Sequence, residues 1–283
     1  MFSQRLFTAG VLFVLATFGV TAQDRPVAPA TPRIYIFDNG TIAGLDPALF
    51  NFKREELKEV DFVNVSYLIV HPRGTLMFDS GAVADSHFKG DGNPVVEGIM
   101  SATQPLLPQL ASAGYAPGAI TYFAMSHYHS DHTANANAFA GATWIVQRAE
   151  RDFMFAEKPE GIIQPGTYDA LRAAKTKVLN NEDFDVFGDG SVMMMSTPGH
   201  TPGHQVLSVK LANKGTVVLG GDLYHYPEER TTGRTPTFEF NAEQSTASRA
   251  RIEQYLKATG GTLWIEHDKA THAALPKAPR YVD

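Results

Sequence analysis

The stretch SHYHSDH, Ser126 to His132, places four side chains that can bind a metal ion within six residues. It follows an apolar segment, AITYFAM, and leads into a run of small residues. His127 and His129 alternate, so on an extended segment both imidazoles point the same way and can hold one ion. Asp131 and His132 then lie at the start of the next helix, where they can hold a second ion. One histidine here would indicate only a polar loop, but this spacing predicts a metal site.

Three more side chains of the same kinds follow at the ends of apolar segments, namely His200 in TPGHTPGH, Asp222 in GGDLYH and His267 in IEHD. Each alone is weak evidence, but with the first cluster they complete a set for two ions. Asp222 can bridge ions about 3.5 to 4 Å apart, while neutral imidazoles leave net positive charge on the pair. That charge lowers the pKa of a bridging water to about 7, so hydrolysis is the expected reaction.

We expect two divalent metal ions, with zinc as the default, because histidine and aspartate also accept iron, cobalt or manganese. A binding module that the metals only hold together is the non-catalytic alternative. Structural zinc sites are usually closed by four protein ligands, often cysteines. The chain contains no cysteine, and seven ligands for two ions leave positions open for water.

The composition is that of a globular enzyme, with 283 residues of which 43% are hydrophobic and 19% charged. A net charge of -6 argues against a nucleic-acid partner, which a basic surface would bind. We therefore expect a small-molecule substrate and no nucleic-acid partner, and we also expect no stable membrane anchor. The sequence leaves a homodimer open.

The N-terminus has the three parts of a secretory signal peptide, which are Arg5, the apolar residues 6–20, and small residues up to Ala22. The 15 apolar residues are fewer than the roughly 20 that span a bilayer. We expect cleavage near Ala22 and a periplasmic or secreted protein. Residues 23–32 then form a short linker, and residues 33–283 a single domain.

Apolar segments of β type alternate with helical segments along this domain, which predicts a layered α/β fold with the site along one sheet edge. Strands are expected at 34–38, 63–72, 74–80, 119–126, 142–147, 191–198, 204–211, 216–222 and 262–268. Helices are expected at 94–114, 131–141, 168–179 and 241–261.

HYHSDH resembles the HxHxDH motif of the metallo-β-lactamase superfamily, and His200, Asp222 and His267 match its later ligand motifs in order. The resemblance implies a four-layer αβ/βα sandwich. It also implies two metal sites that share Asp222. One would be made by His127, His129 and His200, and the other by Asp131, His132 and His267.

Within the superfamily, the chain resembles the acyl-homoserine lactonase (quorum-quenching) family in three places. These are IYIFDNGTIAGLDPALF (34–50), TPGHTPGHQVLSV around His200, and the pair His267-Asp268. The absence of cysteine and the bridging aspartate argue against β-lactamases. Glyoxalase II would need a C-terminal glutathione-binding region, but only 16 residues follow His267.

The resemblance implies that a metal-bridging hydroxide opens the lactone ring and that Asp222 relays a proton to the leaving oxygen. The alternatives are hydrolysis of other carboxylic esters or thioesters and, less favoured, β-lactamase or phosphodiesterase activity. Lactonases of this family carry a substrate-binding tyrosine three residues after the bridging aspartate, where this chain has His225. Either Tyr224 or His225 takes that role, or neither does. The candidate catalytic residues are thus Asp222, Asp131, Tyr224 and His225.

Other side chains are candidates for support and for substrate binding. His204 and Asp268 are candidates to orient the ligands. Segments 153–161 and 226–240 resemble long loops that could shape the entrance. An apolar wall for an acyl chain could come from aromatic residues and a methionine near the motifs, which are Phe139, Phe153, Met154, Phe155, Phe238 and Phe240.

Overall fold

A computed structural model describes residues 28–90, 92–158 and 161–283. The expected signal peptide, residues 1–22, and the first part of the linker lie outside the described residues. Within the described ranges, none of the helices combines the length and apolar character that a membrane span requires.

The first sheet has nine strands in the order β4-β5-β1-β2-β3-β6-β7-β8, with β14 also paired to β1. β3, β6, β7 and β8 are parallel to one another, whereas the remaining pairs are antiparallel. The strands are β1 (Arg33–Ile42), β2 (Phe62–His71), β3 (Gly74–Phe78), β4 (Val95–Val96), β5 (Met100–Ser101), β6 (Tyr122–Ala124), β7 (Thr143–Gln147), β8 (Thr176–Leu179) and β14 (Tyr281–Val282).

The second sheet has five strands in the order β13-β12-β11-β10-β9. Only β12 and β13 pair in parallel, so the chain leaves both of these strands at the same sheet edge. The strands are β9 (Phe184–Asp185), β10 (Val192–Ser196), β11 (Gln205–Leu211), β12 (Gly215–Leu219) and β13 (Thr262–Trp264).

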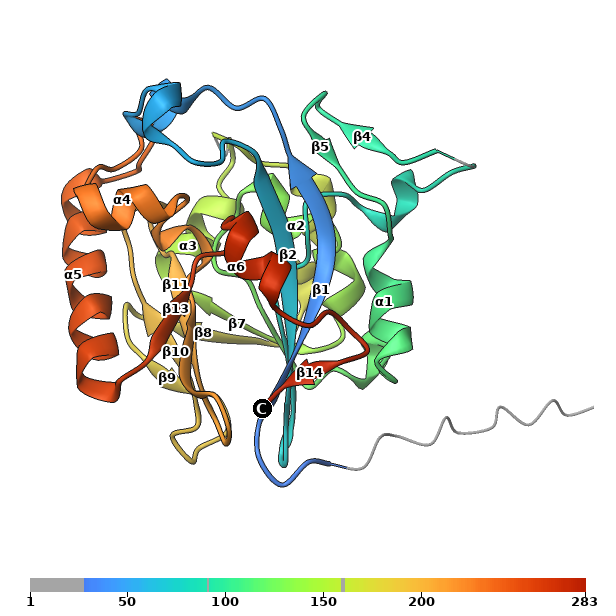
Figure 1. Cartoon of the computed structure of the whole chain (residues 1–283). Helices are drawn as coiled ribbons and strands as arrows, with labels where there is room; N and C mark the ends of the chain where they lie inside the picture. Colours follow the sequence, from blue (N-terminus) through green and yellow to red (C-terminus); the bar gives the residue numbers. More distant parts are fainter. Residues whose placement is uncertain (1–27, 91, 159–160) are drawn as a thin grey trace, which may run out of the picture.

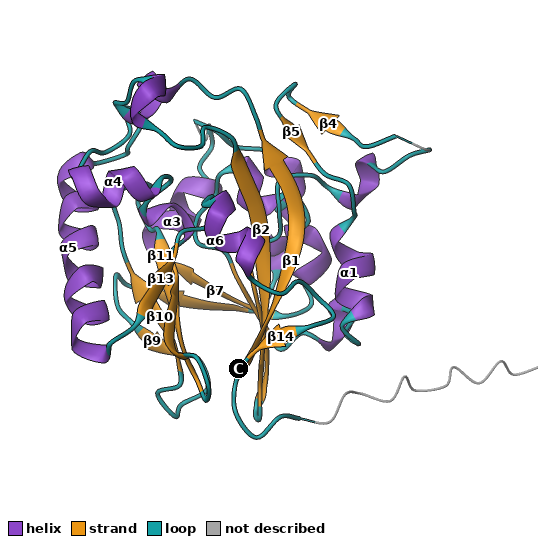
Figure 2. Cartoon of the chain, viewed as in Figure 1, coloured by secondary structure: helices purple, strands orange, loops and turns teal. Residues whose placement is uncertain are grey.

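Helices cover the outer face of each sheet, and the two inner faces pack on each other (Figures 1 and 2). The α-helices are α1 (Leu106–Ser112), α2 (Ser130–Thr133), α3 (Arg148–Met154), α4 (Pro227–Thr232), α5 (Ala242–Thr259) and α6 (Lys269–Ala274). Within the described ranges the chain also forms 3-10 helices, at Pro47–Phe50, Arg54–Glu56, Asp85–His87, Pro117–Ala119, Ala136–Phe139, Pro165–Thr167, Asp169–Ala173 and Gly221–Leu223.

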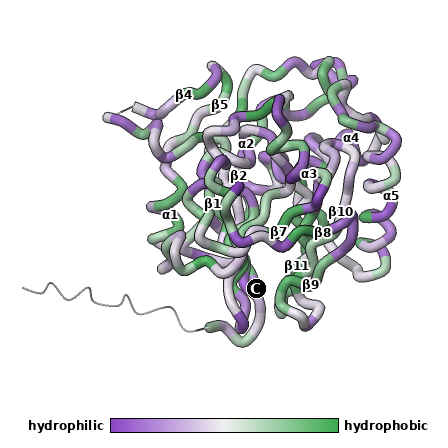
Figure 3. The backbone as a smooth tube through the Cα atoms, turned by 180° about the vertical axis from the view of Figure 1, so that it is seen from behind, coloured by the Kyte–Doolittle hydropathy of each residue, from purple (hydrophilic) through white to green (hydrophobic). Residues whose placement is uncertain are grey.

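Three apolar cores separate these layers. The largest lies between the sheets and joins residues such as Ile69 to Leu207 and Trp264. A second packs α1 and α3 on the outer face of the first sheet, and a third packs α5 on the second sheet. Figure 3 shows the hydrophobic colour along β7 and β8, whereas α5 at the edge is largely hydrophilic. The expected four-layer αβ/βα sandwich is confirmed.

Segment 241–261 is a helix as expected, because Asn241 caps its start and Gly260 ends it in the left-handed conformation. The helix expected at 94–114 is wrong in its first half. Only Leu106–Ser112 is helical, after Pro105, and the preceding part forms the hairpin of β4 and β5. Glu97 and Gly98 turn this hairpin with positive φ, which a helix does not allow.

Two further helices are shorter than expected. Residues 168–179 form a 3-10 helix and then β8, because Val178 and Leu179 complete the sheet beside β7. Residues 131–141 divide into α2 and the 3-10 helix Ala136–Phe139. Segment 226–240 is not wholly a loop, since it contains α4.

Truncation in the core between the sheets should destabilise the fold strongly. Leu207 is fully buried at the centre of the second sheet, where it pairs with Met194 and Leu219. We expect Leu207→Ala to lower the free energy of unfolding by about 2–5 kcal/mol, measured by urea denaturation followed by circular dichroism. Val95→Ala is the matched control, because this side chain is 63% exposed. An equally small decrease in the free energy of unfolding in both variants would contradict the central role of Leu207 in the core.

Candidate metal centre

Seven histidine and aspartate side chains from separate loops converge at one edge of the two sheets. His127, His129, Asp131 and His132 follow β6, and His200 lies in the turn between β10 and β11. Asp222 follows β12, and His267 follows β13. The structure groups them as the resemblance implies. Ligand atoms lie within 4.8 Å of one another in one set of His127, His129, His200 and Asp222, and in another of Asp131, His132 and His267.

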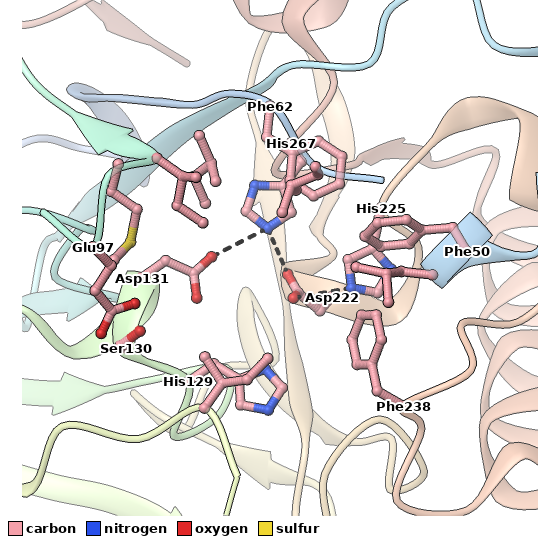
Figure 4. Close-up of a pocket in the computed structure, with 16 residues that line it drawn as sticks. Phe50, Phe62, Glu97, His129, Ser130, Asp131, Asp222, His225, Phe238 and His267 are labelled. Carbon is pink, nitrogen blue, oxygen red and sulfur yellow. Dashed lines mark ion pairs between the residues drawn. The ribbon is translucent and has the colours of Figure 1, made fainter. Parts of the chain in front are cut away.

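Asp222 lies between the two sets, and each of its carboxylate oxygens faces different imidazoles. Oδ1 lies 3.2 Å from His132 Nε2 and 3.0 Å from His267 Nε2. Oδ2 lies 3.5 Å from His127 Nε2 and 3.4 Å from His200 Nε2. Figure 4 shows this carboxylate between the histidines that line the pocket. The geometry is that of a carboxylate shared by two cation sites.

The chemistry of the donors fits divalent cations. Burial lowers the pKa of His127 and His129 well below the usual value, so both imidazoles are neutral and can donate a lone pair. Burial alone would raise the pKa of Asp222, but the imidazoles of His267 and His132 have a larger, opposite effect. The pKa of Asp222 is therefore well below its usual value, and the group is ionised. Among the residues that the structure describes, the buried atoms His127 Nε2, His132 Nε2 and Asp222 Oδ1 have no hydrogen-bond partner. Such atoms cost about 1–3 kcal/mol each when unsatisfied, a cost that metal ligation would remove.

The backbone at Asp222 is held by close packing. Gly221 has a φ of +47°, and a Cβ there would lie 2.4 Å from Ser126 Cβ. The Asp222 N–H donates to His204 Nε2 at 3.1 Å, and His204 Nδ1 lies 2.8 Å from Thr197 Oγ1. Burial lowers the pKa of His204 to about 3, which keeps this ring neutral and able to accept. His204 therefore contacts the backbone of Asp222, and its role in orienting a ligand stays a prediction.

Asp268 has a different role from the expected one. Its carboxylate caps α6, where Oδ1 accepts from the N–H of Ala270 at 3.1 Å and Oδ2 binds Thr271. It begins a helix instead of orienting a ligand imidazole.

Buried carboxylates that the motifs did not reveal lie behind the ligand imidazoles. Asp79 Oδ2 and Glu266 Oε1 lie 3.3 and 3.4 Å from His132 Nδ1. Glu239 Oε1 lies 3.5 Å from His200 Nδ1. Carboxylates in this position fix the orientation of metal-binding imidazoles. Asp79 directly follows β3 and lies at the same sheet edge as the ligands. An aspartate at the end of an apolar strand was therefore the signal in the sequence that could have identified it.

His267 is supported by the backbone, and His127 by a neighbouring hydroxyl. His267 Nδ1 lies 2.9 Å from the carbonyl oxygen of Val63, which therefore accepts a hydrogen bond from the ring. His127 Nδ1 lies 3.0 Å from Ser126 Oγ.

The structure brings His225 to the cluster and turns Tyr224 away from it. His225 Nε2 lies 3.2 Å from Asp222 Oδ2. The Tyr224 hydroxyl instead donates to Glu253 at 3.3 Å, and the guanidinium of Arg249 lies over its ring. Tyr224 is extended, with φ -143° and ψ 144°, so neighbouring side chains point in opposite directions.

A cavity of about 270 Å³ opens beside the cluster, with the ligands on one side and an apolar wall on the other (Figure 4). Of the six candidates for this wall, only Phe238 lines the cavity. Phe139 and Met154 are buried in the outer core, and Phe153 and Phe155 pack against it. Phe240 is exposed.

The segment that resembles the lactonase family supplies four residues of the wall instead. The apolar lining consists of Ile42, Leu45, Leu49 and Phe50 from this segment, together with Phe62, Ile99, Met100, Ile162 and Phe238. Of the two expected entrance segments, 226–240 contributes Phe238, and Ile162 lies just beyond the end of 153–161.

Comparison with known proteins identifies related sequences and folds. Residues 60–259 match the family described as the Metallo-beta-lactamase superfamily. The N-acyl homoserine lactonase AttM of Rhizobium radiobacter is 28% identical over 264 residues, which cover 88% of this chain and 98% of that protein.

Solved structures share the fold. A quorum-quenching N-acyl homoserine lactone lactonase superposes with a TM-score of 0.73 at 23% identity, over 89% of this chain and 98% of its own. AidC, described as a dizinc quorum-quenching lactonase in complex with a product, has a TM-score of 0.64 at 20% identity, over 83% and 87%.

Removal of the shared carboxylate should cost metal binding. We expect Asp222→Ala to retain at most one tightly bound ion per chain where the unaltered protein retains two, because both sets of ligands depend on this residue. Plasma mass spectrometry after gel filtration gives the metal count. Asp268→Asn is the control, since Asp268 caps α6, and it should keep the full count. Two ions retained in Asp222→Ala would contradict the shared role.

Proposed function

Because the chain belongs to the metallo-β-lactamase superfamily, we propose that it is a dinuclear metal-dependent hydrolase that opens the ring of N-acyl homoserine lactones. One observation carries the proposal, which is the position of Asp222 between two sets of metal ligands at the polar side of an apolar cavity. The N-acyl homoserine lactonase AttM, which matches almost along its whole length, supports this choice of substrate.

The cavity suits a molecule with a polar ring and an apolar tail. Its polar side carries His129, Asp222 and His267, whereas Leu49 and Phe50 belong to the opposite, apolar side. A lactone ring would lie against the cluster, and the acyl chain would remove apolar surface from water at about 25 cal/mol per Å².

When bound, two divalent cations would supply hydroxide at neutral pH and polarise the carbonyl oxygen of the ester. Zinc is the ion we propose, since AidC is a dizinc lactonase of the same fold. The side chains of the protein would transfer the proton that the leaving oxygen needs. Asp222, which is ionised, would accept the proton of the hydroxyl group that adds to the carbonyl carbon and deliver it to the ring oxygen as the carbon–oxygen bond of the ring breaks. His132 and His267 contact the other oxygen of this carboxylate, and Asp131 in turn contacts His132.

In this proposal His225 binds the substrate carbonyl, and its contacts support that role. Its Nε2 lies at the cavity beside Asp222, while its Nδ1 lies 3.3 Å from Glu229 Oε1. Arg249 Nη2 donates to Glu229 Oε2 at 2.8 Å, so the buried carboxylate is itself fixed. A ring held in this way can direct Nε2 into the cavity with little loss of side-chain entropy.

Hydrolysis of other carboxylic esters or thioesters is the second candidate. The observation that favours it is the same His225, since an imidazole there replaces the phenol that well-known lactonases use. The ring packs edge-to-face on Phe50 and Phe238 at centroid distances of 5.0 and 5.8 Å, so the polar group lies in an aromatic environment.

We also propose that the enzyme acts in the periplasm or outside the cell. The proposal is supported by the sequence alone, through Arg5, the apolar residues 6–20 and the small residues before Ala22.

A substrate panel tests the choice of reaction. In pH-stat assays of the metal-replete enzyme we expect short- and long-chain acyl-homoserine lactones to be opened faster than an aryl ester, a glutathione thioester or a β-lactam. Asp222→Ala should lower lactone turnover by several orders of magnitude, because it removes the proton carrier and the shared ligand. If the lactones are inert while another substrate turns over, the lactonase proposal is wrong and the metal centre stands.

Two neighbouring substitutions test which side chain binds the carbonyl. We expect His225→Leu to lower kcat by about 100-fold while both metals remain bound, the usual cost of a lost donor to a developing oxyanion. Tyr224→Phe should stay within about threefold of the unaltered enzyme, because its hydroxyl binds Glu253. Steady-state kinetics with one lactone decides between them. A larger loss in Tyr224→Phe would reverse the assignment.

A further inference from the structure

Two ligand loops must be held at a fixed separation if three imidazoles are to share one ion. His127 and His129 lie in the loop after β6, and His200 lies in the turn between β10 and β11. His129 Nδ1 and His200 Nε2 are 3.1 Å apart, although these residues are 71 positions apart in the chain. Metal sites need such geometry to within about 0.5 Å.

One buried side chain outside the ligand set touches both loops. Glu150 lies in α3, is only 3% exposed, and accepts a hydrogen bond at 2.8 Å from the N–H of Tyr128, between His127 and His129. It also accepts at 2.8 Å from the N–H of Gly203 and at 2.8 Å from Thr201 Oγ1. The second of these loops contains His200, which directly precedes Thr201.

Gly203 packs so closely against Glu150 that a larger side chain at position 203 could not be accommodated. A Cβ at Gly203 would lie 2.6 Å from Glu150 N and 2.7 Å from Glu150 Cβ, closer than real Cβ contacts. The turn that bears His200 therefore lies directly on α3, and the carboxylate is enclosed by the groups it binds.

The contacts require a carboxylate in particular. All the groups around it donate, since they are two backbone N–H groups and one hydroxyl. Both oxygens of Glu150 are used, with Oε1 toward Tyr128 and Oε2 toward Gly203. A glutamine has the same shape but offers one oxygen, and its NH2 would face a donor.

We infer that Glu150 is a positioning residue that sets the separation of the two loops and thereby the metal affinity of the site made by His127, His129 and His200. The site made by Asp131, His132 and His267 should depend on it less, because among the described residues Glu150 makes no hydrogen bond with these three ligands and meets the loop after β6 at Tyr128. The inference rests on the metal centre of the proposed function and not on the choice of substrate.

Metal affinity measured apart from activity tests this role. Apo protein is titrated with Co²⁺ and Zn²⁺ against a chromophoric chelator, and the Co²⁺ absorption spectrum reports the ligand geometry. Burial raises the pKa of the Glu150 carboxyl to about 7, so the titration is made at pH 8, where it is ionised. We expect Glu150→Gln to raise the Kd of one of the two bound ions by at least tenfold, with an altered Co²⁺ spectrum, and to change the Kd of the other ion much less.

A matched control lies on the same helix. Asp152→Asn makes the same change of charge at an exposed position of α3 and should leave both Kd values unchanged. Thr201→Val removes a single donor to Glu150 and should weaken the same ion by a smaller factor.

The outcomes separate this inference from the proposed function. Two unchanged Kd values in a folded Glu150→Gln, even with a lowered Tm, would overturn the inference and leave only a structural role. If Glu150→Gln does not fold, Thr201→Val decides, and an unchanged affinity in that variant would likewise overturn it. Failure of the unaltered protein to bind two ions would instead count against the dinuclear function itself.

Discussion

The Asp222 carboxylate is the interaction on which the rest of this site depends. Its two oxygens are in contact with imidazoles from four separate loops, and every ion pair that Asp222 makes in the described chain is with a histidine. An ionised carboxylate and several neutral imidazoles are expensive to bury unless a cation binds them. The fold tolerates the burial of these polar side chains because the hydrophobic core between the two sheets is large. The strands that precede the ligands end at the same sheet edge, which brings the ligands together.

The surroundings of Asp222 show how an accurate site is built from few motifs. Gly221 allows the close approach to Ser126, and His204 binds the backbone N–H of Asp222. Behind the ligands, carboxylates such as Asp79 and Glu266 restrict the imidazoles, as Glu229 restricts His225. Metal affinity and rate in such sites depend on this support, because the ligands cannot fix their own orientation.

Substrate selection belongs to a different part of the chain. Residues 42–50 build part of the apolar wall, and they lie far in sequence from the metal motifs but next to them in the fold. The exposed fraction of Leu49, at 42%, places part of this wall at the cavity mouth. Chain length and polarity of the substrate can therefore change without any change at the metal ligands.

The sequence by itself determined the candidate ligands and the layered fold. His127, His129, Asp131 and His132 are recognisable because local spacing fixes which side chains share a face, and the strands are recognisable by their apolar runs. Residues 94–114 and 168–179 were wrongly predicted to be helices throughout, because strand pairing in a hairpin and in the first sheet outweighs their helical propensity.

Only the tertiary structure decided that His225 and not Tyr224 reaches Asp222, that Phe50 and not Phe139 lines the cavity, and that Glu150 joins two ligand loops. These contacts join residues far apart in sequence, or depend on which face of a backbone a side chain occupies. No local pattern records them, because they arise only when the sheets pack and their loops meet.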